Sequence, residues 1–164
     1  MNQAERYLKL AALTKRMDTI DSSYHAAFYL LSHDPELWKT ACRYVTVDGI
    51  GFTGLKRAAR GFDERTRHIV DIAHNLFSWN STCKATPFEI SRLGYPLMEQ
   101  VCNALYIAAG EVQVVITQGQ DGKAKMGLDD SRYQNTKRIC SRFEQLSRVM
   151  AADMVQDEAE EPER

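Results

Sequence analysis

The sequence predicts an all-α protein, a single compact bundle of about seven or eight helices. Most segments repeat apolar residues every three or four positions, the spacing of one face of an α-helix. A helix-capping residue followed by proline opens two of these segments, at Asp34-Pro35 and at Thr86-Pro87. With 164 residues, of which 44% are hydrophobic and 26% charged, the chain can bury one core without metal or disulfide support.

The first half of the chain predicts one helix that is more buried than the others. Asp21 and Ser22 can cap the segment Tyr24–Ser32, which is apolar on nearly every side. We therefore expect this segment to be the most buried element. The other expected helices cover residues 3–17, 35–45, 55–60, 64–77, 87–94 and 97–108, and the last one follows Asp129-Asp130-Ser131.

Residues 111–128 allow two interpretations. Val112, Val114 and Ile116 alternate with other residues, and glycines follow, which is typical of a short β-hairpin. The alternative is a helix that runs on to about residue 117 and is followed by a mobile loop. We slightly favour the helix with a loop, because an isolated hairpin is only marginally stable.

The last predicted helix carries a narrow apolar seam and is followed by an acidic tail. The seam consists of Thr136, Ile139, Phe143, Leu146 and Met150. We expect it to close the protein's own core rather than to pair with a partner helix, because it spans only about two heptads. Residues 156–164 are polar and acidic and predict disorder, so residues 1–155 are expected to form a single helical domain.

The N-terminus and the cysteines favour a reduced, cytoplasmic protein that does not enter a membrane. Charged residues interrupt the first seventeen positions, so we expect no signal peptide, and no apolar run reaches the length of a membrane span. Cys42, Cys102 and Cys140 fall on apolar stripes, and Cys83 falls in a polar loop as the one candidate exposed thiol. The cysteines show no C-x-x-C pair, and we expect no disulfide framework.

One glycine motif resembles the dinucleotide fingerprint. Gly49, Gly51 and Gly54 have the G-x-G-x-x-G spacing, in which glycines let a backbone approach a pyrophosphate. That chemistry requires a strand before the motif and a second parallel strand after it, whereas the flanking segments here are predicted helices. We favour a turn between helices, and a nucleotide-dependent enzyme at Gly49–Gly54 is kept as an unfavoured alternative.

No catalytic or metal-binding constellation stands out. His25, His33, His68 and His74 do not share metal-ligand spacing, and His68 and His74 fall on different helical faces. We therefore expect a protein that is not an enzyme and has no cofactor.

Two basic clusters are the main candidate binding features. Residues 56–67 carry a local net charge of +3, and residues 123–148 carry +4, although the whole chain has a net charge of −1. The candidate contact residues are Lys56, Arg57, Arg60, Arg65, Arg67, Arg132, Lys137, Arg138, Arg142 and Arg148. Such faces can contact phosphates or an acidic protein surface, although many helices carry similar charges only to face solvent.

Two stretches, taken together, resemble a known family. The first consists of Ala26–Ser32, Asp34, Glu36–Trp38 and Gly49–Phe52, and the second of Ile69–Phe77 and Cys102–Leu105. Over about residues 20–110 they resemble an uncharacterised family of small helical proteins from Firmicutes-like bacteria and their mobile elements. The resemblance implies a bacterial or phage origin and a non-secreted helical domain, and it brings no catalytic residues.

The sequence thus predicts a non-enzymatic helical protein that binds another protein. We expect this protein to act in the regulation, defence or counter-defence of a mobile element. The alternative partner is nucleic acid, bound by the same arginines. The sequence does not indicate the oligomeric state.

Overall fold

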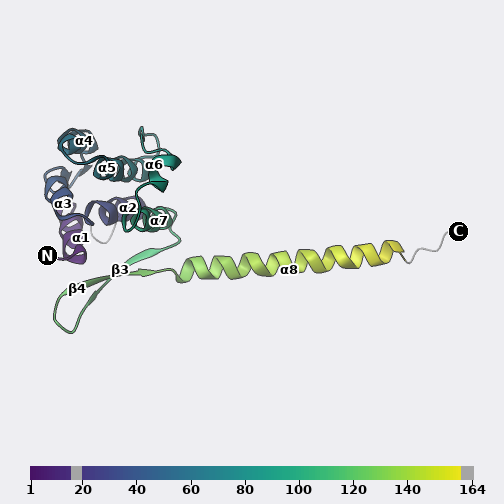
Figure 1. The fold of residues 1–164 in the computed structure, drawn as a ribbon. Helices are drawn as coiled ribbons and strands as arrows, with labels where there is room; N and C mark the ends of the chain where they lie inside the picture. The colour runs from purple at the N-terminus through teal and green to yellow at the C-terminus, as the bar shows by residue number, and fades with distance from the viewer. Residues whose placement is uncertain (16–19, 160–164) are drawn as a thin grey trace. The chain divides into compact units, whose positions relative to one another are not determined.

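The computed structural model describes residues 1–15 and 20–159 and is mostly helical (Figure 1). Over these residues the chain forms eight α-helices, one 3-10 turn and two antiparallel sheets of two strands each. The predicted helical character is therefore confirmed, but the single bundle is not. The chain divides into two compact units, Met1–Asp129 and Asp130–Arg164.

The first unit contains all the elements except the last helix. Their order is α1 (Gln3–Leu13), α2 (Ser22–Leu31), α3 (Pro35–Ala41), β1 (Val45–Thr46), β2 (Gly49–Ile50), α4 (Phe52–Ala58), η1 (Ala59–Gly61), α5 (Glu64–Phe77), α6 (Pro87–Ser91), α7 (Leu97–Ala108), β3 (Gln113–Gln118) and β4 (Ala124–Asp129).

Side-chain caps fix where several of these helices begin, as the sequence predicts. The Asp21 carboxylate accepts hydrogen bonds from the first turn of α2, and the Asp34 carboxylate accepts one from the first turn of α3. Asp63 caps α5 by accepting from the Thr66 backbone N–H at 2.9 Å, and this hydrogen bond lowers the pKa of Asp63. Thr86 and Glu89 form the predicted capping box of α6.

The core of the first unit surrounds α2. Residues Ala26 to Leu31 are all buried, so the most buried element is the predicted one. α2 packs against both α5 and α7. Tyr24 adds an edge-to-face contact with Phe77 of α5, with ring centroids 4.8 Å apart.

A buried arginine ties α1 to the end of α2. Arg6 donates to the backbone carbonyls of Ser32 at 2.6 Å, His33 at 2.7 Å and Met1 at 2.8 Å. The carbonyls at the C-terminal end of a helix carry partial negative charge and lack partners within the helix. The guanidinium therefore satisfies polar groups that the core would otherwise leave without hydrogen bonds.

The favoured interpretation of residues 111–128 is wrong, because a β-hairpin replaces the expected helix and loop. β3 pairs with β4 in register, with Val114 opposite Leu128 and Ile116 opposite Met126. The hairpin is not isolated: Val114, Ile116 and Met126 are partly buried against the core. β4 also contacts α1, where the Asn2 side chain donates to the Ala124 carbonyl at 2.8 Å. This docking supplies the stability that a free hairpin lacks.

The glycine motif has a structural explanation at each position. Gly49, the first residue of β2, has φ +139° directly after the tight turn that follows β1, and Gly51 precedes the first residue of α4. A Cβ on Gly54 would lie 2.6 Å from Cε1 of Tyr44, so only glycine fits there. In the described part of the chain, every sheet is two-stranded and antiparallel, which differs from the parallel strands that the dinucleotide fingerprint requires.

The second unit consists of one long helix, α8 (Ser131–Ala159). The apolar seam residues Ile139, Phe143, Leu146 and Met150 are exposed on α8, and the expectation that they close the protein's own core stays a prediction. Cys140 is likewise exposed rather than buried on an apolar stripe. Among the described residues of this unit, α8 is the only helix or strand.

The helix also reaches into the predicted acidic tail. α8 extends through residues 156–159 of the predicted disordered tail, and residues 160–164 lie outside the described residues. Residues 130–155, which were expected to belong to one helical domain with the rest, fall in the second unit.

Candidate functional site: a basic pocket beside α4 and α5

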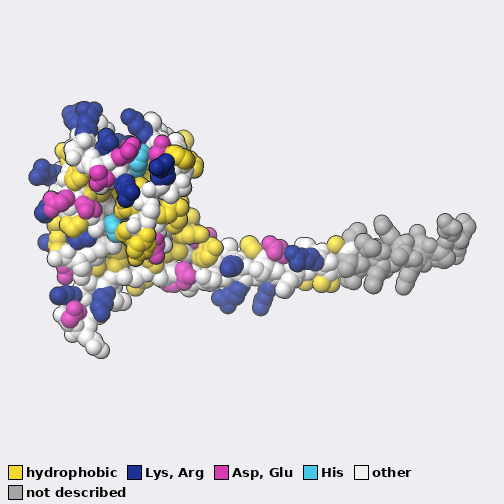
Figure 2. All heavy atoms as spheres, viewed as in Figure 1, with side chains coloured by type: hydrophobic (Ala, Val, Ile, Leu, Met, Phe, Trp, Pro, Cys, Tyr) yellow, Lys and Arg dark blue, Asp and Glu magenta, His cyan; other side chains and the backbone are white. Residues whose placement is uncertain are grey.

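An open hollow of about 740 Å³ lies on the first unit, lined by α4, η1, α5 and the loop that follows α5. Its charged and polar lining consists of Thr53, Lys56, Arg57 and Arg60 from α4 and η1, Glu64, Arg67, His68, Asp71 and His74 from α5, and Thr82 and Lys84 from the loop. We call this hollow the basic pocket. Figure 2 shows Lys and Arg side chains gathered over this part of the unit, with acidic and His side chains among them.

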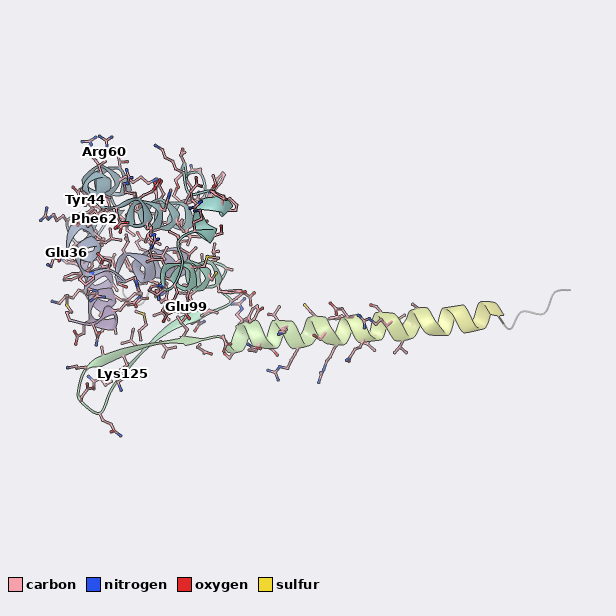
Figure 3. The ribbon with its side chains drawn as sticks, in the orientation of Figure 1. Glu36, Tyr44, Arg60, Phe62, Glu99 and Lys125 are labelled. Atoms are coloured by element: carbon pink, nitrogen blue, oxygen red, sulfur yellow. The ribbon has the colours of Figure 1, made fainter. Side chains whose placement is uncertain are left out.

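Helical spacing places these side chains together. Glu64, Arg67, His68, Asp71 and His74 follow one another at intervals of three, one, three and three residues, so they share one face of α5. The opposite face carries the buried residues of the core. Arg60 projects outward from the end of α4 (Figure 3).

An ion pair fixes one side of the basic pocket. The Lys56 Nζ lies 2.8 Å from Asp71 Oδ1 and donates to the Thr82 carbonyl at 3.0 Å. It thereby joins α4, α5 and the loop after α5. A second pair, His68 and Glu64, is looser, with 3.9 Å between Nε2 and Oε1.

His74 belongs to the pocket lining and is partly buried there. Its ring stacks on Phe52 with centroids 4.6 Å apart, and its Nδ1 is buried without a hydrogen-bond partner in the described structure. Burial lowers the pKa of His74, the positive charge of Lys56 lowers it further, and the Asp71 carboxylate partly opposes both. Protonation of the His74 imidazole would add to the positive charge of the pocket.

The remaining cations of the basic pocket have no carboxylate partner. Within the described residues, no ion pair within 4.0 Å involves Arg57, Arg60, Arg67 or Lys84. Because Lys56 neutralises Asp71, these four side chains face only one further carboxylate in the lining, that of Glu64, and the pocket has a net positive charge. Such an arrangement favours an anionic group, either a carboxylate or a phosphate.

A second hollow adjoins the basic pocket and adds an aromatic surface. It has a volume of about 420 Å³ and shares Glu64 and His68 with the basic pocket. Phe88 lines it and is 65% exposed, and the Arg92 guanidinium lies 5.4 Å from the centre of the Phe88 ring. We call this hollow the Phe88 hollow. Cationic and aromatic side chains thus share one face of the first unit.

The structure brings together only part of the predicted contact residues. Lys56, Arg57, Arg60 and Arg67 gather at the basic pocket, whereas Arg65 lines the Phe88 hollow. Lys137, Arg138 and Arg142 lie along one face of α8, in the other unit. Arg132 and Arg148 also belong to α8 but lie outside that group.

Sequence reasoning missed the polar face of α5. It placed His68 and His74 on different helical faces, whereas both side chains line the basic pocket. Glu64 precedes His68 by four residues, and Asp71 precedes His74 by three, which was a detectable signal. Cys83, expected as an exposed thiol, is partly buried, and its Sγ lies 3.7 Å from the Ala85 carbonyl oxygen.

The described residues include no group of three or more His, Cys, Asp or Glu side chains that could hold a metal ion. No helix in the same residues combines the length and the apolar character of a membrane span. Comparison with protein-family models, with curated proteins and with solved structures gives no match. The family resemblance of residues 20–110 therefore stays a prediction.

Proposed function

We propose that this protein is a non-enzymatic binding protein whose basic pocket captures an acidic segment of another protein. The observation that carries the proposal is the shared face of the basic pocket and the Phe88 hollow. Unpaired arginines would bind carboxylates of the partner, and the Phe88 ring would bind an apolar side chain beside them.

The aromatic component favours a protein partner. Arginine and aromatic residues are enriched where protein interfaces concentrate their binding energy. Trp79 is 90% exposed in the same loop that contributes Thr82 and Lys84 to the pocket. A partner that is acidic but also carries an apolar anchor would use both kinds of contact.

A binding measurement with a defined probe tests this proposal. The probe is a fluorescent peptide of alternating Glu and Gly with one central Leu, and fluorescence anisotropy gives its Kd. The double variant Arg57→Glu, Arg60→Glu should weaken binding at least about tenfold, because it reverses two unpaired charges. Arg43→Glu is the matched control, since Arg43 is exposed and lies outside both hollows. Equal affinity of the three proteins would contradict the proposal.

The second candidate is a nucleic-acid-binding protein. It is favoured by the arginines without carboxylate partners and by the basic face of α8 at Lys137, Arg138 and Arg142. Binding through phosphates would weaken steeply with salt, and removal of residues 156–164 would strengthen it by removing competing acidic groups. A mobility shift at low salt with DNA and with RNA tests this candidate, and an absence of binding with and without these residues rejects it.

The biological setting that we propose follows the family resemblance. A cytoplasmic protein of bacterial or phage origin would act in the regulation, defence or counter-defence of a mobile element. A pull-down from the native host, repeated with Arg57, Arg60, Arg138 and Arg142 changed to Glu, would identify the partner and show which basic surface it contacts.

A further inference from the structure

α8 presents an apolar seam to its surroundings. Ile139, Phe143, Leu146 and Met150 are spaced by four, three and four residues and are between 46% and 65% exposed. Large apolar side chains in contiguous exposed patches mark interaction surfaces. Within its described residues, the second unit is a single helix and has no other helix or strand that could cover the seam.

The charges of the helix run against its dipole. Its described N-terminal part carries Arg132, Lys137, Arg138, Arg142 and Arg148, with Glu144 as the acidic exception from Ser131 to Ala151. The sequence of the remaining part of α8, up to Ala159, carries the acidic residues Asp153, Asp157 and Glu158 and no basic one. Basic groups at the N-terminus and acidic groups at the C-terminus both destabilise an isolated helix. An antiparallel neighbour with the same sequence would place opposite charges beside each other at both ends.

We propose that α8 pairs with α8 of a second copy of this chain in an antiparallel, two-stranded coiled coil. The seam is symmetric about the point between Glu144 and Gln145. An antiparallel pair centred there sets Phe143 against Leu146 and Ile139 against Met150, and each of these contacts occurs twice. A parallel pair would instead set basic segment against basic segment and acidic segment against acidic segment.

The mass of the full chain in solution tests the pairing. Light scattering after size exclusion should give twice the 18.7 kDa of the chain at high protein concentration. Phe143→Glu should convert this dimer to a monomer. Ser141→Glu is the control and should leave the dimer intact, because Ser141 lies on the side of α8 away from the seam. The proposal is overturned if the wild-type chain is still a monomer at about 0.1 mM. It is also overturned if Phe143→Glu leaves the dimer unchanged.

The orientation is tested by spin labels placed on the full chain in a background without native cysteines. In the antiparallel pair, the two Lys137 positions lie about 22 Å apart along the helix axis, because they differ by fifteen residues in register. The two Gln145 positions lie close together at the centre. The pulsed electron paramagnetic resonance distance should therefore be longer for labels at Lys137 than for labels at Gln145. Equal distances at the two sites would indicate a parallel pair and would overturn the proposal.

Discussion

Lys56 and Asp71 form an ion pair that joins α4 to α5 at the edge of the basic pocket, with 2.8 Å between Nζ and Oδ1. Both side chains are mostly covered, being 27% and 16% exposed. The pair matters for the charge of the pocket, because Lys56 neutralises Asp71, and in the part of the chain that the structure describes Arg57, Arg60, Arg67 and Lys84 form no ion pair within 4.0 Å.

Removal of the lysine from this pair should destabilise the fold. We expect Lys56→Met to lower the free energy of unfolding by about 1–3 kcal/mol, because Asp71 is left as a poorly solvated carboxylate. Adding Asp71→Asn to the Lys56→Met variant should restore part of the lost free energy of unfolding. Urea denaturation of the two single variants and the double variant measures the coupling. Strictly additive effects would show that the pair contributes no interaction energy.

Gly54 should tolerate no side chain. Gly54→Ala places a Cβ 2.6 Å from the Tyr44 ring, and we expect it to destabilise the protein by about 1–3 kcal/mol. Gly61→Ala is the matched control, since no atom lies within 4 Å of a Cβ built there. Thermal melts of both variants measure the difference. A Gly54→Ala variant that melts at the wild-type temperature would contradict the expected destabilisation.

A ligand screen separates this structural explanation from the nucleotide alternative. If the three glycines serve only the turn, the start of α4 and the contact with Tyr44, then NAD, FAD and ATP should leave the melting temperature of the wild-type protein unchanged. A concentration-dependent rise with any of them would support the nucleotide-dependent enzyme at Gly49–Gly54.

Stability should fall as the pH falls below neutral. Burial lowers the pKa values of His25, His33 and His74 below the ordinary value of 6.5. The unfolded chain therefore binds more protons than the folded one as the pH falls below 6.5, and the stability present above that pH is progressively lost. Urea denaturation at a series of pH values from about 5 to about 7.5, a range that includes the ordinary pKa of histidine, measures how the free energy of unfolding changes with pH. A free energy of unfolding that rises toward pH 5 would contradict it.

Local signals in the sequence predict the helices of the first unit well. Asp21, Asp34 and Thr86 all cap the helices that they were expected to open, because capping needs only a few neighbouring residues. The burial of Ala26–Leu31 follows from local composition in the same way.

Features that depend on distant contacts were not predictable in this way. Alternation at residues 112–116 indicated a strand, but whether a hairpin is stable depends on its docking against α1 and the core. The seam of α8 has the same pattern whether it packs inside its own chain or against a second copy. The basic pocket combines α4, η1, α5 and a loop, so its sequence signal was limited to the first basic cluster and the polar face of α5.

The most direct test of the proposed function is a residue-level map of where an acidic ligand binds. Titration of the ¹⁵N-labelled protein with the Glu-rich peptide containing one Leu should shift amide signals of Lys56, Arg60, Arg67 and Lys84, together with Phe88, while signals of β3 and β4 stay in place. Shifts spread evenly over the exposed cations of the chain, or absent from α4 and α5, would contradict binding at the basic pocket.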